Sequence, residues 1–382
     1  MRFLLAPDKF KDALDAAGVC QAMAAGIREV LPHAEIITCP MGDGGEGTGP
    51  LLAQALNAIE QRETVLDALG RECTARWWLT ADRTTAVIEM AEASGLWRLS
   101  PAERGALRTS SHGTGQLIKA ATESGARRVF LCVGGSATVD GGAGCLQALG
   151  WRLLDAGGRE LSPPLTGADL RRIARLEPPA NPPVPPNPPV IDLQILCDVD
   201  NPLLGPRGAA PVFGPQKGAS PDEVQELAAG LESWAGVLKE ATGREVADVP
   251  GAGAAGGLPA GLFCTLRARL AAGFDVLAEA VDLRNKLSGC DWCLTGEGRL
   301  DEQTFGGKVV AGVTRCAAEA GVPTAVFVGA AVLRAGETLE QLARRLGTAA
   351  IQIISPRGLS HEAALAQTAS NLRCAVADFV RS

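Results

Sequence analysis

The chain has 382 residues, which is enough for one large or two medium domains, and 46% of them are hydrophobic, which suffices for a buried core. Its 36 basic and 43 acidic residues give a net charge of −7 without a basic stripe, so neither nucleic acid nor an anionic membrane is expected as a partner. No apolar run is long enough to span a membrane, and the apolar start before Asp8 is too short for a secretory signal. The eleven cysteines are dispersed along the chain, which favours a reduced, cytoplasmic location.

Short apolar runs alternate with helical patterns along the chain. A helix is predicted at 15–31, with Asp15 as its N-cap, and further helical patterns cover 308–320 and 361–381. Near-continuous apolar strands between helices are typical of an α/β fold with a parallel sheet. Such strands are predicted at 2–7, 34–41, 127–135, 190–200, 290–298, 323–330 and 348–356.

Two segments depart from this pattern. Residues 62–90 alternate in polarity between turn signals, which favours antiparallel strands and a second subdomain in the middle of the chain. Residues 177–190 (EPPANPPVPPNPPV) are too rich in proline for a helix or a central strand, and we interpret them as an extended surface loop.

The segment 130–144 (FLCVGGSATVDGGAG) places five glycines around Ser136, Thr138 and Asp140, directly after an apolar run. Glycine loses more conformational freedom on folding than other residues, so a stretch this rich in it is expected to be a loop. Such a loop exposes backbone N–H groups that can hold a phosphate.

Four other predicted strands also end in loops that combine glycine or proline with charged side chains. Lys9 and Lys11 follow the first strand, Asp43 and Glu46 the second, and Asp198 and Asp200 the strand at 190–200, while the strand at 290–298 runs into Glu297, Arg299, Asp301 and Lys308. Ligands bind beyond the carboxyl ends of parallel strands. Carboxylates at such a position can coordinate Mg²⁺, and cations can stabilise the charge of a transferring phosphoryl group. The pattern therefore favours phosphoryl transfer.

Other motifs are absent or weak. The P-loop pattern and the protein-kinase signatures are missing. A GxGxxG pattern at Gly251, Gly253 and Gly256 follows no clear strand, so a tightly packed helix entry or a loop near substrate is favoured there over a dinucleotide site. The pair in CDWC (290–293) lies within a strand pattern and is interpreted as buried structural cysteines.

Eight motifs, in order, resemble the bacterial glycerate kinases of type 1: APDKFKDAL, MGDGGEGT, SSHGTGQLI, VGGSATVDGGAG, CDVDNPLLGPRGA, VFGPQKGAS, PGAGAAGGL and TGEGRLDEQT. The resemblance runs from residue 3 to about residue 330. It implies ATP-dependent phosphorylation of D-glycerate, typically to 2-phosphoglycerate. It also implies a Rossmann-like parallel-sheet domain (1–60 and 287–382) with an inserted α/β domain (61–286), and an active site in the cleft between them.

On this resemblance, Gly134, Gly135, Ser136, Thr138, Asp140 and Gly141 would form the loop for the ATP phosphates. Asp198 is the favoured base for the glycerate hydroxyl, with Asp43 as the runner-up. Asp43, Glu297 and Asp301 are the candidate Mg²⁺ ligands, and Lys9 and Arg299 would hold the glycerate carboxylate or the γ-phosphate. Lys11, Asp200, Lys217 and Lys308 are the further candidates for substrate binding.

Several alternatives stay open at this stage. The enzyme could be a glycerate 3-kinase, or act on a related small hydroxy acid, and it could be a monomer or a homodimer. An NAD-dependent oxidoreductase using Gly251–Gly256 and a non-catalytic carboxylate-binding protein are rivals from other classes. The oxidoreductase reading does not explain the other four charged loops, and the binding-protein reading lacks the export signal that such proteins are expected to need.

Overall fold

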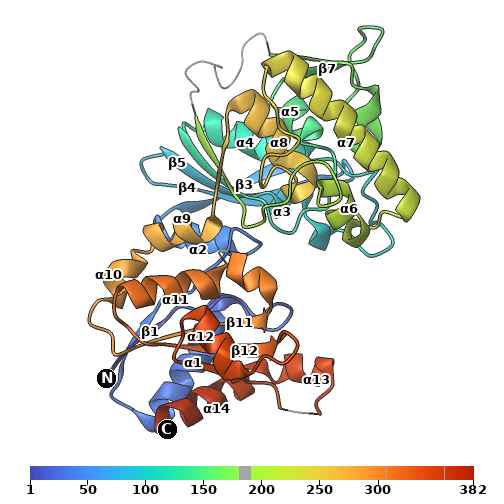
Figure 1. Cartoon of the computed structure of the whole chain (residues 1–382). Coiled ribbons are helices and arrows are strands. Elements are labelled where there is room, and N and C mark those ends of the chain that lie inside the picture. The colour runs from blue at the N-terminus through green and yellow to red at the C-terminus, as the bar shows by residue number, and fades with distance from the viewer. Residues whose placement is uncertain (180–190, 307, 357) are drawn as a thin grey trace. The chain divides into compact units, whose positions relative to one another are not determined.

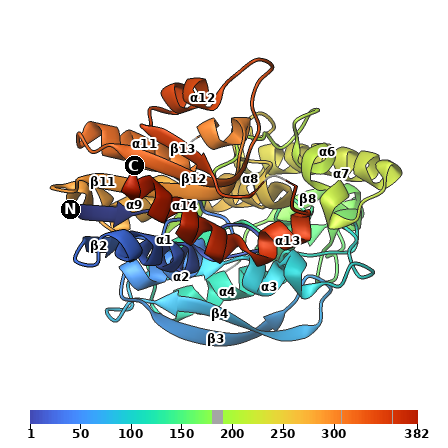
Figure 2. The same cartoon turned by 90° about the horizontal axis from the view of Figure 1, so that it is seen from below.

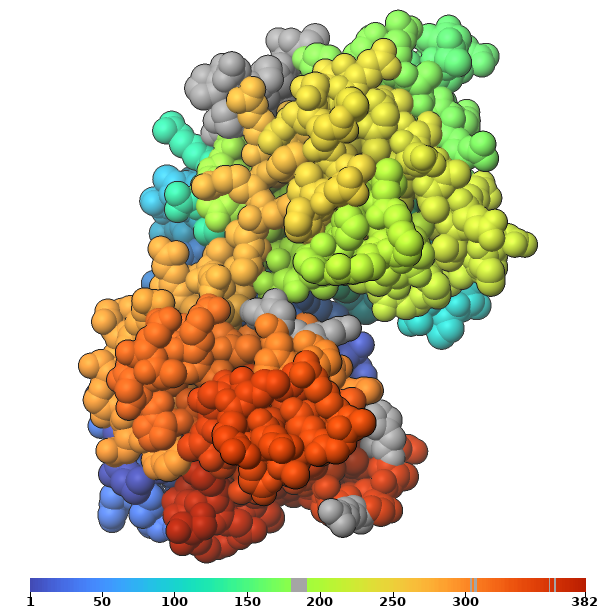
Figure 3. All heavy atoms as spheres, in the orientation of Figure 1, coloured from blue at the N-terminus to red at the C-terminus, as the bar shows by residue number. Residues whose placement is uncertain are grey.

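The computed structural model describes residues 1–179, 191–306, 308–356 and 358–382. Two compact units make up the chain: the first contains residues 1–43 and 272–382, and the second contains residues 44–271. Both chain termini lie in the first unit, whose residues are blue and orange to red in Figure 1. Figure 3 gives the same colours to all atoms, so that green and yellow spheres mark much of the second unit.

The first unit is built on a five-stranded sheet in the order β13-β12-β11-β1-β2, and every neighbouring pair is parallel. The apolar strand β1 lies inside the sheet, with Phe3, Leu4 and Leu5 buried, as expected for parallel strands covered on both faces. The strands are β1 (Arg2–Leu5), β2 (Glu35–Thr38), β11 (Trp292–Leu300), β12 (Thr324–Ala331) and β13 (Ala350–Ile353).

Helices connect these strands. The helix α1 begins after Asp15, whose side chain accepts a hydrogen bond of 2.7 Å from the Gly18 N–H and so caps the helix. Figure 2 shows α1 beside α14, and Gly26 permits this contact because a Cβ atom there would lie 2.4 Å from the Arg373 carbonyl oxygen. The helices are α1 (Ala16–Val30), α9 (Gly273–Ala280), α10 (Leu283–Leu287), the 3-10 helix η4 (Glu302–Gly306), α11 (Val309–Glu319), α12 (Leu339–Leu346), α13 (His361–Ala366) and α14 (Thr368–Arg381).

The second unit has a mixed six-stranded sheet in the order β10-β9-β6-β5-β4-β3. The pairs from β10 to β5 are parallel, whereas β5, β4 and β3 pair in antiparallel fashion. A separate antiparallel pair joins β7 to β8. The strands are β3 (Ile59–Leu66), β4 (Glu72–Leu79), β5 (Thr85–Glu89), β6 (Arg128–Cys132), β7 (Arg152–Leu154), β8 (Arg175–Glu177), β9 (Asp192–Leu196) and β10 (Arg269–Ala271).

A large apolar core lies within this unit and includes the fully buried Trp234 of the long helix α7. Ser220 and Glu223 form a capping box at the start of α7. The helices are α2 (Thr48–Ala55), α3 (Ala91–Ser94), η1 (Leu96–Arg98), α4 (His112–Glu123), α5 (Ala143–Ala148), η2 (Gly167–Arg172), α6 (Ala209–Phe213), η3 (Pro215–Lys217), α7 (Pro221–Thr242) and α8 (Ala254–Leu266).

The structure confirms the α/β fold with parallel strands, the seven strands predicted in chain order, and the antiparallel strands within 62–90. The helical pattern over 361–381 is also confirmed, and it forms two helices, α13 and α14, that meet at Gln367. Most of the proline-rich segment, 180–190, lies outside the described residues. In the described part of the chain no helix is long and apolar enough to cross a membrane, and none of the eleven cysteines forms a disulfide.

Candidate functional site

The five charged or glycine-rich loops lie at the carboxyl ends of strands, but they divide between two sheets. In the first unit, Lys9 follows β1, Asp43 follows β2, and Asp301 follows β11. In the second unit, the glycine-rich loop of residues 133–142 follows β6, and Asp198 lies two residues beyond β9. The sequence pattern located the strand ends correctly and did not reveal that they belong to separate sheets.

The glycine-rich loop is held in a defined conformation. The Leu96 N–H donates to the Gly135 carbonyl (2.8 Å), and the Ala137 N–H donates to the Ser94 carbonyl (2.9 Å), so both sides of Ser136 are fixed to a neighbouring segment. Gly256, from the glycine run that opens α8, packs against the loop at a distance that only glycine allows. A Cβ atom on Gly256 would lie 1.9 Å from the Thr138 carbonyl oxygen.

Asp140 organises the inside of this loop. Its carboxylate is fully buried and accepts hydrogen bonds from the Ser111 N–H and hydroxyl, both at 2.7 Å, and from the N–H groups of Gly142 and Gly144. Burial raises the pKa of Asp140, while these four hydrogen bonds act in the opposite direction and stabilise the ionised form. Asp140 therefore holds the backbone of the loop in place through its own protein partners.

Lys217 lies beneath the same loop and is 2% exposed. Its Nζ atom contacts the Ser136 hydroxyl (2.8 Å) and the Thr138 carbonyl oxygen (2.7 Å). Burial lowers the pKa of Lys217 to about 7, and the charge of Asp140 partly offsets that effect. The hydroxyl of Thr138 is buried and makes no hydrogen bond to any described residue.

The strand β9 brings a second acidic segment to the same edge. Leu196 of β9 pairs with Cys132 of β6, so Asp198 and the start of the glycine-rich loop leave the sheet at adjacent positions. Asp198 is half-buried. The side chain of Asp200 is 74% exposed and forms an ion pair of 2.6 Å with Arg207, so these two predicted residues occupy very different environments.

In the first unit, the charge of Asp43 acts on both Asp8 and Glu297, and that of Glu297 acts on Asp8; we call these three residues the carboxylate trio. Burial, with the charges of Asp43 and Glu297, raises the pKa of Asp8 to about 7. Burial also raises the pKa of Glu297 to about 7, although the Thr304 hydroxyl donates to its Oε1 atom at 2.6 Å. Like charges held close together in a partly dry site favour protonation or a bound cation.

This donor set can be tested against the requirements of Mg²⁺. Among the described residues, no three His, Cys, Asp or Glu side chains converge closely enough to form a complete metal site. Magnesium usually takes only one or two carboxylates and completes its shell with water and substrate phosphates. The trio fits that requirement, whereas Asp301 is one-third exposed and lies 3.8 Å from Arg299.

The predicted cations of this unit lie around the same sheet edge. Lys9 follows Asp8, whose carboxylate accepts the Lys9 backbone N–H at 2.7 Å. Lys308 is the N-cap residue of α11, and its charge partly offsets the rise in the pKa of Glu297. Lys11 is exposed, and the side chain of Arg299 is 68% exposed.

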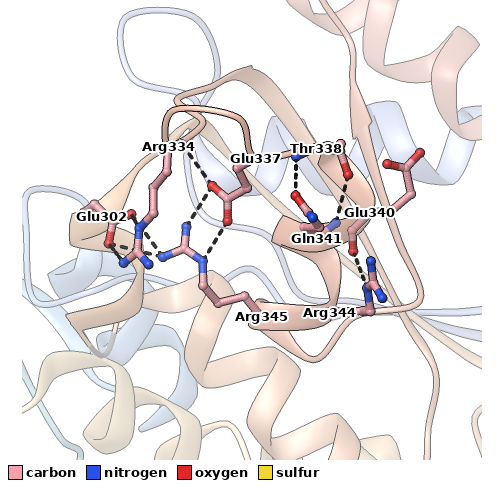
Figure 4. A network of polar contacts seen from close by, with 8 residues as sticks. All are labelled: Glu302, Arg334, Glu337, Thr338, Glu340, Gln341, Arg344 and Arg345. Atoms are coloured by element: carbon pink, nitrogen blue, oxygen red, sulfur yellow. Dashed lines mark hydrogen bonds and ion pairs between the residues drawn. The ribbon is translucent and has the colours of Figure 1, made fainter.

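A polar network anchors the segment that carries Asp301 and Thr304 (Figure 4). Glu302 accepts two hydrogen bonds of 2.9 Å from Arg334 and one of 3.0 Å from Arg345. Arg345 also pairs with Glu337 at 3.1 Å, and its guanidinium lies 4.0 Å from the centre of the Phe305 ring. The network thus fixes η4, and with it the Thr304 hydroxyl that contacts Glu297, to the helix α12.

Sequence reasoning missed Asp8 and Thr304. Asp8 stands beside the lysines that were selected, and its position just after β1 was the available signal. The importance of Thr304 depends on its contact with Glu297, seven positions earlier, and no motif indicates that contact.

The structure around the GxGxxG and CDWC motifs shows which interpretation of each is correct. The GxGxxG run opens α8, and the element before it is the helix α7 instead of a strand, so the predicted tight helix entry is confirmed. Cys290 and Cys293 are both buried, as expected for structural cysteines.

Comparisons with known proteins agree along the whole chain. Residues 3–382 match the model of the glycerate kinase family. The chain is 43% identical to the glycerate 2-kinase of Escherichia coli strain K12, over 83% of this chain and 82% of that protein. It is 42% identical to the glycerate kinase of Halalkalibacterium halodurans, over 85% and 84% of the two chains.

A solved structure gives the same result for the fold. The crystal structure of a glycerate kinase 2 candidate from Salmonella typhimurium LT2 superposes with a TM-score of 0.81 and 35% identity. The superposition covers 100% of this chain and 97% of that one.

Proposed function

Because this chain belongs to the glycerate kinase family, we propose that it transfers the γ-phosphoryl group of ATP to the 2-hydroxyl of D-glycerate and releases 2-phosphoglycerate. The observation that carries this proposal is the family match over residues 3–382, which includes the glycine-rich loop and the charged strand ends. The proposed setting is the cytoplasm, with the protein acting as a monomer or homodimer.

The glycine-rich loop is assigned to the phosphates of ATP. Its backbone is fixed before any ligand arrives, by Asp140 from within and by the contact of Gly256 with Thr138. A preorganised loop of this kind stabilises charge on a phosphoryl group without having to rearrange during the reaction. The six residues of the assignment are Gly134, Gly135, Ser136, Thr138, Asp140 and Gly141.

Asp198 is assigned as the base that orients the glycerate hydroxyl and accepts its proton. It leaves the sheet beside the glycine-rich loop, which suits a group that must act close to the transferred phosphate. Asp43 is the second choice. The further candidates for binding the substrate are Lys11, Asp200, Lys217 and Lys308. Lys217 would act indirectly, through the glycine-rich loop that it contacts.

In the first unit, Asp43 and Glu297 would hold Mg²⁺, with Asp8 beside them and Asp301 as a further candidate. A bound Mg²⁺ ion would neutralise charge on the phosphates of ATP. Lys9 and Arg299 would hold the glycerate carboxylate or the γ-phosphate.

A ³¹P NMR assay with ATP, Mg²⁺ and D-glycerate tests the reaction and its position together. The expected product is 2-phosphoglycerate, and a 3-phosphoglycerate signal would favour the alternative 3-kinase. A panel of related hydroxy acids in the same assay would define the substrate range.

The variants Asp198→Asn and Asp200→Asn, two positions apart, test the assignment of the base. We expect Asp198→Asn to lower kcat by about 10²–10⁴-fold, the usual effect of losing a general base. Asp200→Asn should act mainly on the KM for glycerate, because its side chain is exposed and already paired with Arg207. Undiminished turnover in a folded Asp198→Asn protein would transfer the role to Asp43.

A further inference from the structure

Ser136 and Lys217 form a buried hydroxyl–amine pair within the glycine-rich loop. Their Oγ and Nζ atoms lie 2.8 Å apart, although the residues are 81 positions apart in the chain. Ser136 is 7% exposed and Lys217 is 2% exposed, while the adjacent Gly135 is exposed. The pairing of Gly95 with Ser136 fixes the serine backbone, so this contact belongs to a rigid part of the fold.

The surroundings of Lys217 favour a neutral amine. An ammonium ion that is removed from water without a hydrogen-bonded carboxylate is costly, and a buried lysine therefore releases its proton readily. The described charge that acts on Lys217 is Asp140, whose carboxylate is occupied by four hydrogen bonds from other groups. Lys217 Nζ donates to the Thr138 carbonyl at 2.7 Å and to the Ser136 Oγ at 2.8 Å. Once Nζ has lost a proton, it can keep its bond to Thr138 and accept the Ser136 hydroxyl proton across the second contact.

We propose that Ser136 is a nucleophile activated by Lys217, and that ATP phosphorylates it when no glycerate is present. In this step a bond forms between Ser136 Oγ and the γ-phosphorus, and the bond from that phosphorus to the β,γ-bridging oxygen breaks. ADP leaves with the electron pair, and the serine proton passes to Lys217 Nζ. The resulting ammonium ion then lies beside the new phosphate group and stabilises it.

This inference rests on the proposed function, because it requires the γ-phosphate to lie at the glycine-rich loop. A phosphoserine ester hydrolyses slowly, and its charge would occupy the place assigned to the ATP phosphates. Phosphorylation of Ser136 would therefore inactivate the enzyme when glycerate is scarce. Glycerate would protect the enzyme by accepting the phosphoryl group first.

The test is intact-protein and peptide mass spectrometry of the full chain after incubation with ATP and Mg²⁺, with and without D-glycerate, alongside the ³¹P assay. We expect the mass of one added phosphoryl group, located at Ser136, and a parallel loss of kinase activity. Glycerate should suppress both. Ser136→Ala should gain no phosphate, and Ser94→Ala is the matched control because Ser94 is fully buried on the neighbouring segment and contacts Thr114.

Lys217→Arg keeps a cation that cannot act as a base, and we expect it to slow the phosphorylation by at least about 100-fold. Lys217→Met serves if the arginine does not fit, and circular dichroism shows whether either variant is folded. The proposal fails if a protein that makes 2-phosphoglycerate never gains the phosphoryl group. It also fails if the group is gained by Ser136→Ala, or by Lys217→Arg at the original rate. Failure of both assays would overturn the proposed function as well.

Discussion

The glycine-rich loop and the carboxylate trio both lie at the ends of parallel strands, but they are stabilised in opposite ways. In the loop, the buried carboxylate of Asp140 receives four hydrogen bonds from N–H and hydroxyl groups. In the trio, burial and the charges of neighbouring carboxylates raise the pKa values of Asp8 and Glu297 to about 7. The loop is complete as folded, whereas the trio gains stability from a proton or a cation.

The largest effect should come from breaking the loop. Asp140→Asn replaces one acceptor oxygen by an NH₂ group, which then faces backbone N–H donors in a site with no exposed surface. Because each unsatisfied buried donor costs about 1–3 kcal/mol, we expect the free energy of unfolding to fall by about 3 kcal/mol or more. Urea denaturation measures this loss.

Asp82→Asn is the matched control for that variant. Asp82 also accepts hydrogen bonds from its neighbours, through Thr80 and Thr84, but it lies on an exposed turn of the same unit. Water can replace those partners, so its change should stay below about 1 kcal/mol. Equal losses in the two variants would show that burial is not what makes Asp140 important.

The carboxylate trio should respond to pH in the opposite sense to an ordinary surface carboxylate. In the folded protein the pKa values of Asp8 and Glu297 are about 7, above their usual values of 3.8 and 4.5. At a pH between the usual value and about 7, the folded state therefore binds more protons than the unfolded state. Stability is then present at low pH and is lost as pH rises through about 7.

Calorimetric melting between pH 4.5 and 8 measures this effect as the difference between the original protein and a variant. Asp8→Asn and Glu297→Gln should each flatten the dependence, and excess Mg²⁺ should reduce it in the original protein, because a cation stabilises the ionised carboxylates. Glu319→Gln, which removes an exposed carboxylate paired with Arg284, serves as the control. A stability that rises with pH and is unaffected by these changes would contradict the coupling of the trio.

The two regions also differ in how far the sequence predicts them. The position of the glycine-rich loop follows from local composition, as does the N-cap at Asp15, because glycine content and capping side chains act over a few residues. The contact of Lys217 with Ser136 spans 81 positions, and that of Trp234 with Gly141 spans 93. Such contacts depend on how distant helices pack, and no local pattern encodes them.

The trio was predicted only in part for the same reason. Asp43 follows β2 and Glu297 lies near the end of β11, and both were found by their positions at strand ends. Asp8 acquires its raised pKa from burial and from carboxylates that come from two other strands, so its role appears only when the sheet order β11-β1-β2 is known. Sequence periodicity located the individual strands, but it did not show that β1 lies between the other two.

The smallest effect should come from the network of Figure 4, where Arg344 and Arg345 are adjacent on α12 and provide a matched pair. Arg345 contacts Glu302, Glu337 and the Phe305 ring, whereas the side chain of Arg344 donates only to the Glu340 carbonyl, at 3.3 Å, among the described residues. We expect Arg345→Met to lower the free energy of unfolding by about 1 kcal/mol, since partly buried ion pairs and cation–π contacts are worth about that much. Arg344→Met should change it by less than about 0.5 kcal/mol.

The difference between these two variants should also appear in catalysis if the network positions the trio. Loosening η4 would free Thr304 from Glu297, so Arg345→Met should raise the Mg²⁺ concentration needed for half-maximal activity by about 3- to 10-fold, whereas Arg344→Met should leave it unchanged. Arg345→Lys, which keeps the charge but loses the planar guanidinium on Phe305, should fall between them. A loss of stability without a change in the Mg²⁺ requirement would make the network purely structural. The trio would then depend on β1, β2 and β11 alone for its geometry.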